Sequence, residues 1–166
     1  MSTQRTARTP GGHMDDEAPE DPLALESQIC FALSLASRSV VAAYRPVLEP
    51  LRLTHPQYLV MLALWEHEPL SLTQLSEKLS MNPGTVSPLI KRLEALGYVQ
   101  RGRAREDERA LAIVLTAEGR RLRRRAEEIP GIMMGKLGMD VEELKALHAS
   151  MMKLIRAARA SGDLPG

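Results

Sequence analysis

Residues 71–97 read SLTQLSEKLSMNPGTVSPLIKRLEALG, and this stretch carries the signals of two consecutive helices. Ser71 and Gln74 have the spacing of a capping box, in which each side chain bonds to the backbone of the other residue. The leucines that follow recur at helical spacing, which predicts a short amphipathic helix ending near Ser80.

The second helix of the pair has well-defined limits and two distinct faces. Asn82 is a favourable N-cap, Pro83 fits the first helical position, and Gly97 suits a left-handed C-terminal cap. The apolar stripe is formed by Val86, Leu89, Ile90, Leu93 and Leu96. The opposite face carries Ser87, Pro88 and Lys91, with Thr85 and Arg92 on its flanks. One face is therefore predicted to pack against the domain, while the other is free to meet a partner.

A two-stranded hairpin is predicted directly after this helix. Residues 98–101 and 111–115 have the composition of short strands, and the segment 102–110 between them is strongly charged. Helix, turn, helix and hairpin in this order predict a winged helix-turn-helix in a mainly α fold. This arrangement suits DNA, because the second helix can enter a major groove and a basic hairpin can reach the adjacent backbone or minor groove.

The residue types on these surfaces indicate how they would meet DNA. Thr85 and Ser87 can bond to bases or to phosphates, whereas Lys91 and Arg92 are expected to hold phosphates. The remaining candidates are Pro88 on the same helix and Arg103, Arg105, Asp107 and Arg109 of the hairpin. Charged runs are usually solvated surfaces, and we prefer that interpretation for residues 121–125. The order of the features within residues 71–115 is what favours DNA binding.

Helices are also predicted on both sides of this region. Asp21 and Pro22 have the types of an N-cap and a first helical residue, and apolar residues then repeat at helical spacing as far as Tyr44. Pro46 and Pro50 are expected to end this helix.

Three further capping signals mark the remaining helices. A capping box at Thr54 opens a helix that is apolar on most sides as far as Trp65, so this helix is predicted to be buried. Beyond the hairpin, an Arg-rich helix begins after Thr116, and a last amphipathic helix runs from a capping box at Asp140 to about Ala160.

The net charge of +1 conceals an uneven distribution. Residues 1–22 carry two arginines against five acidic residues, which leaves a net charge of +4 on the remainder. A near-neutral total would by itself argue against a nucleic-acid partner. Here it is the average of an acidic tail and a basic body.

The composition excludes several classes of protein. A single cysteine, Cys30, excludes an intrachain disulfide and a thiolate-rich metal centre, and the four histidines are scattered. No dinucleotide-binding or P-loop pattern occurs, so we expect no metal, no cofactor and no enzyme. The longest apolar run, residues 59–65, is far below the roughly 20 residues that span a bilayer, and a cytoplasmic protein without a membrane partner is expected.

Several motifs in order resemble the MarR family of winged helix-turn-helix repressors. They are LTHPQYLVMLALWE at 53–66, PGTVSPLIKRLEALGYVQR at 83–101, REDERA at 105–110 and LTAEGR at 115–120. The stretch QICFAL at 28–33, followed by SR and by YRP at 44–46, resembles the organic hydroperoxide resistance regulators, OhrR, of the one-Cys type. The resemblance covers roughly Leu23 to Ile155.

The resemblance implies a homodimer, joined through the first and last helices, on a pseudo-palindromic operator. It also implies that Asp107 orients Arg109 as the hairpin approaches the minor groove. The residues alone point the same way, because terminal helices this apolar need a second surface against which to bury their apolar side chains. The expected organisation is a disordered acidic tail (1–20), an N-terminal dimerisation and sensing helix (21–53), the winged helix-turn-helix (54–116), C-terminal dimerisation helices (117–160) and a flexible end (161–166).

Cys30 has two possible roles. On the residues alone it is a small hydrophobe well inside its helix, where the helix dipole gives little activation, so that activation would need Tyr44, His55 or Tyr58. The resemblance aligns Cys30 with the family's peroxide-reactive cysteine, and Tyr44 with a tyrosine that hydrogen-bonds to its sulfur. It implies oxidation to a sulfenic acid, which a small external thiol must resolve because the chain has no second cysteine.

Two positions depart from the family pattern. Ser34 and His55 stand where many relatives have tyrosines of the sensing pocket. Ser34 removes a phenolic donor, and His55 introduces a ring that titrates near neutral pH. His55 is either part of the pocket or simply a solvent-exposed residue at a helix start.

The expected function is a repressor that binds its operator while Cys30 is reduced and is released when organic hydroperoxides oxidise it. One alternative is a MarR-type repressor released by a non-covalent phenolic or aromatic ligand, with Cys30 inert. A second, less favoured alternative is a thiol peroxidase, and an interaction module without DNA binding is less favoured still.

Overall fold

The computed structural model describes residues 21–103 and 111–162 and divides into two compact units, residues 1–39 and 40–166. The predicted acidic tail and the hairpin residues Arg105, Asp107 and Arg109 lie outside the described ranges. Within those ranges, no helix combines the length and apolar character needed to cross a membrane.

The first helix differs from the prediction at both ends. The backbone N–H of Leu23 donates to Asp21 Oδ1 (2.9 Å), but a separate 3₁₀ turn over Leu25–Ser27 comes before α1 (Ile29–Leu48). Pro46 lies inside the last turn of α1 instead of ending it. Proline lacks a backbone N–H and therefore removes one hydrogen bond from the helix. The helix tolerates this loss at Pro46 because it ends two residues later.

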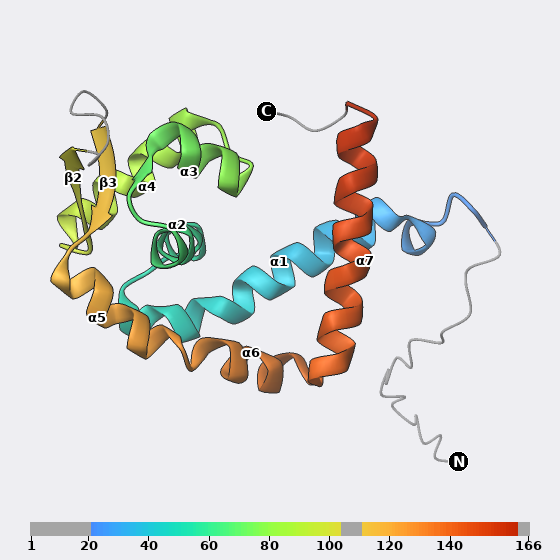
Figure 1. Cartoon of the computed structure of the whole chain (residues 1–166). Coiled ribbons are helices and arrows are strands. Elements are labelled where there is room, and N and C mark those ends of the chain that lie inside the picture. The colour runs from blue at the N-terminus through green and yellow to red at the C-terminus, as the bar shows by residue number, and fades with distance from the viewer. Residues whose placement is uncertain (1–20, 104–110, 163–166) are drawn as a thin grey trace, which may run out of the picture. The chain divides into compact units, whose positions relative to one another are not determined.

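Helix α2 (His55–Glu66) is the centre of the second unit, as its apolar sequence predicts. Its capping box is formed, and the backbone N–H of Thr54 donates to Gln57 Oε1 (2.8 Å). Val60, Met61 and Leu64 are fully buried. Figure 1 shows α2 end-on, and it packs against α3 (Leu72–Leu79), α4 (Pro83–Ala95), α5 (Ala117–Ala126) and β3 (Leu111–Leu115).

The predicted helix-turn-helix is formed by α3 and α4. Helix α3 ends at Leu79 and is followed by the C-cap residue Ser80, which has a left-handed backbone (φ 50°). Asn82 caps α4 by accepting a hydrogen bond from the backbone N–H of Thr85 (2.9 Å), and Gly97 follows α4 with a φ of 76°. Since a positive φ strains most side chains, glycine is the residue suited to that position.

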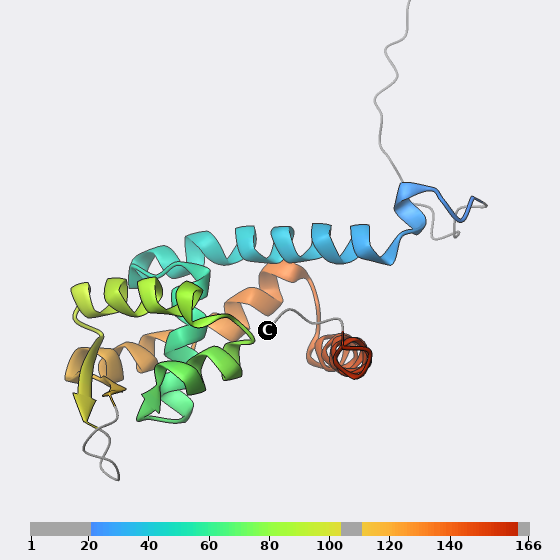
Figure 2. The ribbon, with the colours of Figure 1, turned by 90° about the horizontal axis from the view of Figure 1, so that it is seen from above.

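The predicted hairpin is confirmed, and a third strand joins it. β2 (Val99–Arg103) pairs with β3 from Val99↔Leu115 to Arg103↔Leu111. The unpredicted strand β1 (Leu70–Ser71) pairs with the other edge of β3, so the antiparallel order is β1-β3-β2. The hairpin lies beside α4 (Figures 1 and 2).

The C-terminal helices leave apolar side chains without a partner. Helices α5, α6 (Ile129–Leu137) and α7 (Val141–Ala160) follow in order, and Asp140 caps α7 as predicted. No residue of α7 is buried. Its large exposed apolar side chains are Val141, Leu147, Leu154 and Ile155. Helices with this much apolar surface usually contact a further partner.

Candidate functional site

Helix α4 is held on one face and free on the other. The side chains of Val86, Ile90 and Leu93 are almost completely buried in the core. Of the residues predicted for DNA contact, Thr85, Pro88, Lys91 and Arg92 are exposed and Ser87 is half-buried. The packing therefore fixes the direction of α4, while its outer residues can reach a ligand.

The surroundings of α4 carry further basic residues that the sequence prediction did not assign to the site. Lys78 is exposed in the last turn of α3, and Arg101 is exposed on β2, where its Nε lies 3.3 Å from Glu94 Oε2. The signal for Arg101 was its place on the first hairpin strand, two positions before Arg103 in the sequence. Lys78 and Arg101 thus lie on elements that pack against α4, and lysine and arginine side chains are common partners of DNA phosphates.

The hydroxyl of Thr85 is already engaged within the helix cap. Thr85 Oγ1 lies 3.1 Å from Asn82 Oδ1, and the carboxamide oxygen can only accept, so the hydroxyl hydrogen points to it. The lone pairs of Thr85 Oγ1 remain free to accept hydrogen bonds. Thr85 therefore matches an amino group of adenine or cytosine better than it matches a phosphate.

The three aromatic residues predicted to surround the sensor come together in the second unit. The ring centroid of Tyr44, on α1, lies 5.3 Å from that of His55 and 6.0 Å from that of Tyr58, both on α2. Trp65 extends the cluster, with its centroid 6.3 Å from Tyr58. Trp65 was missed as a site residue, although it lies seven positions after Tyr58, on the same side of α2.

Burial sets the protonation of this cluster. Desolvation lowers the pKa of His55 below its usual 6.5, which favours the neutral ring. Desolvation also raises the pKa values of Tyr44 and Tyr58 above 10, and Tyr44 contributes to the increase at Tyr58. His55, at the start of α2, is half-buried, and its ring lies against that of Tyr44.

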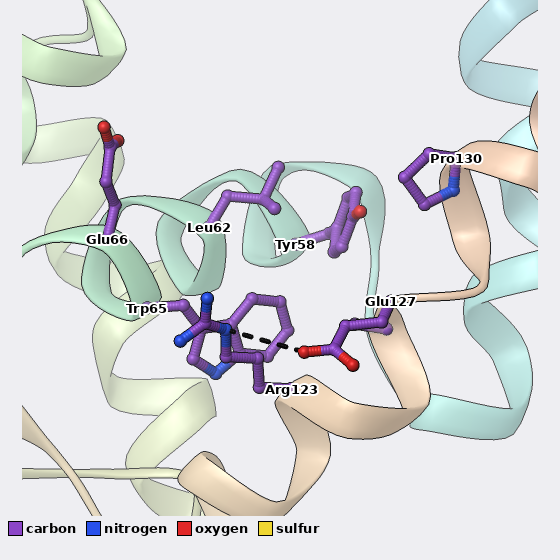
Figure 3. A pocket seen from close by; sticks show the side chains of 8 residues that line it. Tyr58, Leu62, Trp65, Glu66, Arg123, Glu127 and Pro130 are labelled. Carbon is purple, nitrogen blue, oxygen red and sulfur yellow. Dashed lines mark ion pairs between the residues drawn. The ribbon is translucent and has the colours of Figure 1, made fainter.

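An open pocket of about 360 Å³ adjoins the cluster. Tyr58, Leu62, Trp65 and Glu66 line it from α2, and Arg123, Ala126, Glu127 and Pro130 line it from α5 and the start of α6 (Figure 3). Arg123 Nε lies 4.0 Å from Glu127 Oε1, across one helical turn. The pocket thus combines aromatic and apolar walls with a few charged groups, the cation of Arg123 and the carboxylates of Glu66 and Glu127, as small-molecule sites often do.

Cys30 is exposed and is the second residue of α1. The prediction that it lies well inside its helix, far from the helix dipole's end, is wrong because the chain before Ile29 forms a separate 3₁₀ turn. Fourteen residues along one α-helix span about 21 Å, so Cys30 and Tyr44 of the same α1 are too far apart for a hydrogen bond.

Comparisons with known proteins cover most of the chain. Residues 53–111 match the family model described as MarR family. The chain is 43% identical over 155 residues to the HTH-type transcriptional regulator TtmR of Methylorubrum extorquens (strain PA1), covering 92% of this chain and 80% of that protein. It is 41% identical over 135 residues to the organic hydroperoxide resistance transcriptional regulator of Bacillus subtilis (strain 168), covering 81% and 92%.

A solved structure shows the same fold bound to DNA. Reduced AbfR in complex with DNA, a protein of Staphylococcus epidermidis, is 29% identical to this chain with a TM-score of 0.72. The match covers 85% of this chain and 96% of AbfR. With the helix-turn-helix, the hairpin and relatives aligned over most of its length, the chain belongs to the MarR family of DNA-binding transcriptional regulators, and its fold is a winged helix-turn-helix.

Proposed function

We propose that the protein is a peroxide-sensing repressor that binds a pseudo-palindromic DNA operator while Cys30 is reduced. The observation that carries the DNA-binding part is the geometry of α4, whose inner face is buried while Thr85, Pro88, Lys91 and Arg92 stay exposed. In this proposal α4 enters the major groove, with Thr85 and Ser87 at base edges and Lys91 and Arg92 at phosphates. Arg103, Arg105 and Arg109 of the hairpin contact the flanking backbone or minor groove, with Asp107 orienting Arg109.

We propose further that the protein acts as a homodimer joined through its first and last helices. The exposed apolar residues of α7, together with Ile29, Leu35 and Val41 of α1, support this proposal because they need a covering surface. Two-fold symmetry also matches a pseudo-palindrome, since each α4 then meets one half-site about one helical turn of DNA from the other.

The signal in this proposal is an organic hydroperoxide. The Cys30 thiolate attacks the outer peroxide oxygen, the O–O bond breaks, and the alkoxide leaves as an alcohol after taking a proton. Cys30 is left as a sulfenic acid. A small thiol then displaces hydroxide, which leaves as water, and a second thiol returns Cys30 to its reduced form while the two small thiols become a disulfide.

In this proposal the aromatic cluster of one chain lies beside Cys30 of the other chain in the dimer. Because Tyr44 of the same helix is about 21 Å away along α1, the hydrogen bond that the resemblance implies must come from Tyr44 of a second chain. His55 and Tyr58 would then lie close to that cysteine as well, since both contact Tyr44. The sensing pocket is thus assembled between two chains.

Oxidation would release the operator by disturbing this interface. A loss of affinity of 10- to 1,000-fold requires about 1.4 to 4 kcal/mol. One polar sulfur species that lacks hydrogen bonds in an apolar contact can supply that amount. The dimer would then favour an arrangement in which the two α4 helices no longer match the half-sites.

Cys30→Ser provides the test. We expect this variant to bind a duplex selected by the wild-type protein with unchanged affinity and to stay bound when cumene hydroperoxide is added, as measured by fluorescence anisotropy. The wild-type complex should dissociate under the same conditions. Release of the serine variant by the peroxide would overturn the redox part of the proposal.

The pocket beside α5 favours a second candidate function, a repressor released by a non-covalent aromatic ligand. Tyr58 and Trp65 provide aromatic walls, and Arg123 is the basic residue of the lining, beside the carboxylates of Glu66 and Glu127. The test uses salicylate as the probe with Cys30→Ser in the absence of oxidant. Saturable release that Arg123→Gln weakens would select this function, and full retention of DNA would exclude it.

A further inference from the structure

The carboxylate of Glu68 joins three elements that meet at the base of the hairpin. Glu68 follows α2 and comes two residues before β1. Its Oε2 accepts a hydrogen bond from the backbone N–H of Leu115, the last residue of β3 (2.8 Å). Its Oε1 accepts from Arg120 Nε and lies 2.9 Å from an Arg120 terminal nitrogen, so both oxygens are engaged.

The sheet register explains why a side chain occupies this place. β1 pairs with β3 as Leu70↔Ile113 and Ser71↔Ala112, and continuing this antiparallel register would place Glu68 opposite Leu115. β1 begins only at Leu70, so its backbone does not extend the pairing as far as Glu68. The Glu68 carboxylate supplies the acceptor for Leu115 instead, which ends the ladder with a charge-assisted hydrogen bond.

The environment of Glu68 makes this bond stronger than a surface contact. Its side chain is 25% exposed, whereas that of Arg120 is 57% exposed. A partly buried carboxylate with both oxygens bonded holds its partners more firmly than a fully solvated pair. Trp65, three residues before Glu68, adds a second connection, because its Nε1 donates to the carbonyl of Gly119 (2.9 Å).

We propose that Glu68 is a positioning residue for DNA binding, which fixes the hairpin base to the start of α5 and thereby sets the direction in which the hairpin meets DNA. The inference rests on the proposed binding of DNA by α4 and the hairpin. Glu68 itself contacts no DNA in this account. Its effect should therefore appear where the hairpin binds, and not where α4 binds, since α4 is held by its own core residues.

The test compares Glu68→Ala, Glu68→Gln and Arg120→Gln with the wild-type protein. Glu68→Gln keeps an acceptor for Leu115 and loses the ion pair, whereas Glu68→Ala loses both. Arg121→Gln is the matched control, because Arg121 is the neighbouring exposed residue of α5 and pairs within that helix with Glu118. The readouts are affinity for a duplex selected from a random pool by the wild-type protein, its hydroxyl-radical footprint, and the thermal midpoint.

We expect Glu68→Ala to weaken affinity about tenfold, which corresponds to about 1.4 kcal/mol. The footprint should lose protection at its flanks and keep it at the two central major grooves. Glu68→Gln and Arg120→Gln should fall between Glu68→Ala and the wild type, and Arg121→Gln should match the wild type. Glu68→Gln preserves the test should the alanine variant fail to fold.

Two results would overturn the inference. One is wild-type affinity and footprint in Glu68→Ala, or in Glu68→Gln if only that variant folds. The other is a uniform loss of protection in proportion to a lowered thermal midpoint, which would make Glu68 a purely structural residue. A wild-type protein that selects no duplex would instead overturn the proposed function, and this inference with it.

Discussion

At the residue scale, His55 couples the aromatic cluster to pH. Its pKa is lowered by burial from the usual 6.5, so between the two values the unfolded chain binds a proton that the folded chain does not. The stability that neutral His55 contributes is therefore complete above pH 6.5 and is lost as the pH falls through the folded pKa. Urea unfolding from pH 7.5 to 5 should show a steeper loss of stability in the wild type than in His55→Gln. Equal slopes would contradict this account.

Gly119 is required by a close approach of two backbones. A Cβ atom at this position would collide with the backbone carbonyl oxygen of Tyr98, which cannot move away as a flexible side chain can. Gly119→Ala should lower the free energy of unfolding by about 1–3 kcal/mol through this overpacking.

Gly131 offers the matched control for that substitution. A Cβ at Gly131, within α6, would meet no atom within 4 Å. Gly131→Ala should raise stability by up to about 1 kcal/mol, because alanine is the better helix former. Urea denaturation of both variants provides the measurement, and a stable Gly119→Ala protein would show that the junction between β2 and α5 is loosely packed.

Cap residues were the part of the structure most predictable from single residues. Ser71, Asn82, Thr116 and Asp140 all cap the helices expected of them, because a short side-chain acceptor serves only the few amides next to it. The prediction that Asp21 caps the first helix was wrong for the same reason, since its side chain reaches only nearby amides. It does accept a backbone hydrogen bond, but the amide belongs to a turn that ends before α1 begins.

At the element scale, α4 should separate DNA affinity from stability. Lys91 is exposed, so Lys91→Gln should leave unfolding unchanged, weaken DNA binding, and reduce the salt dependence of binding by about one counterion. Lys136→Gln, on the exposed last turn of α6, is the control for loss of one positive charge. Unchanged affinity and salt slope in Lys91→Gln would contradict the placement of α4 in the groove.

The elements themselves were predictable where their pattern was long and regular. Helices α2, α3 and α4 and the strands of the hairpin follow from periodicity and caps. Strand β1 could not be predicted in this way, because two residues are too few to show an alternating pattern. They form a strand only because they pair with the edge of β3. The pocket between α2 and α5 was also missed, since its residues are some sixty positions apart in the sequence.

At the scale of the whole molecule, the unburied apolar face of α7 should determine the oligomeric state. Leu154→Glu places a charge among the exposed apolar residues of that helix and should shift a dimer to a monomer in analytical ultracentrifugation. Operator binding should fall with it, because a monomer meets only one half-site. Lys145→Gln, at an exposed residue paired with Glu142, should remain dimeric. A wild-type protein that is already monomeric at micromolar concentration would contradict the proposed dimer.

The central claim is that oxidation of Cys30 alone controls DNA binding. The most direct measurement titrates the wild-type protein on its selected duplex with cumene hydroperoxide, and determines the fraction of released DNA and the oxidised fraction of Cys30 by mass spectrometry in the same samples. The account predicts that release rises in step with Cys30 oxidation and that an added small thiol reverses both. DNA that remains bound when Cys30 is fully oxidised, or release while Cys30 is still reduced, would contradict it.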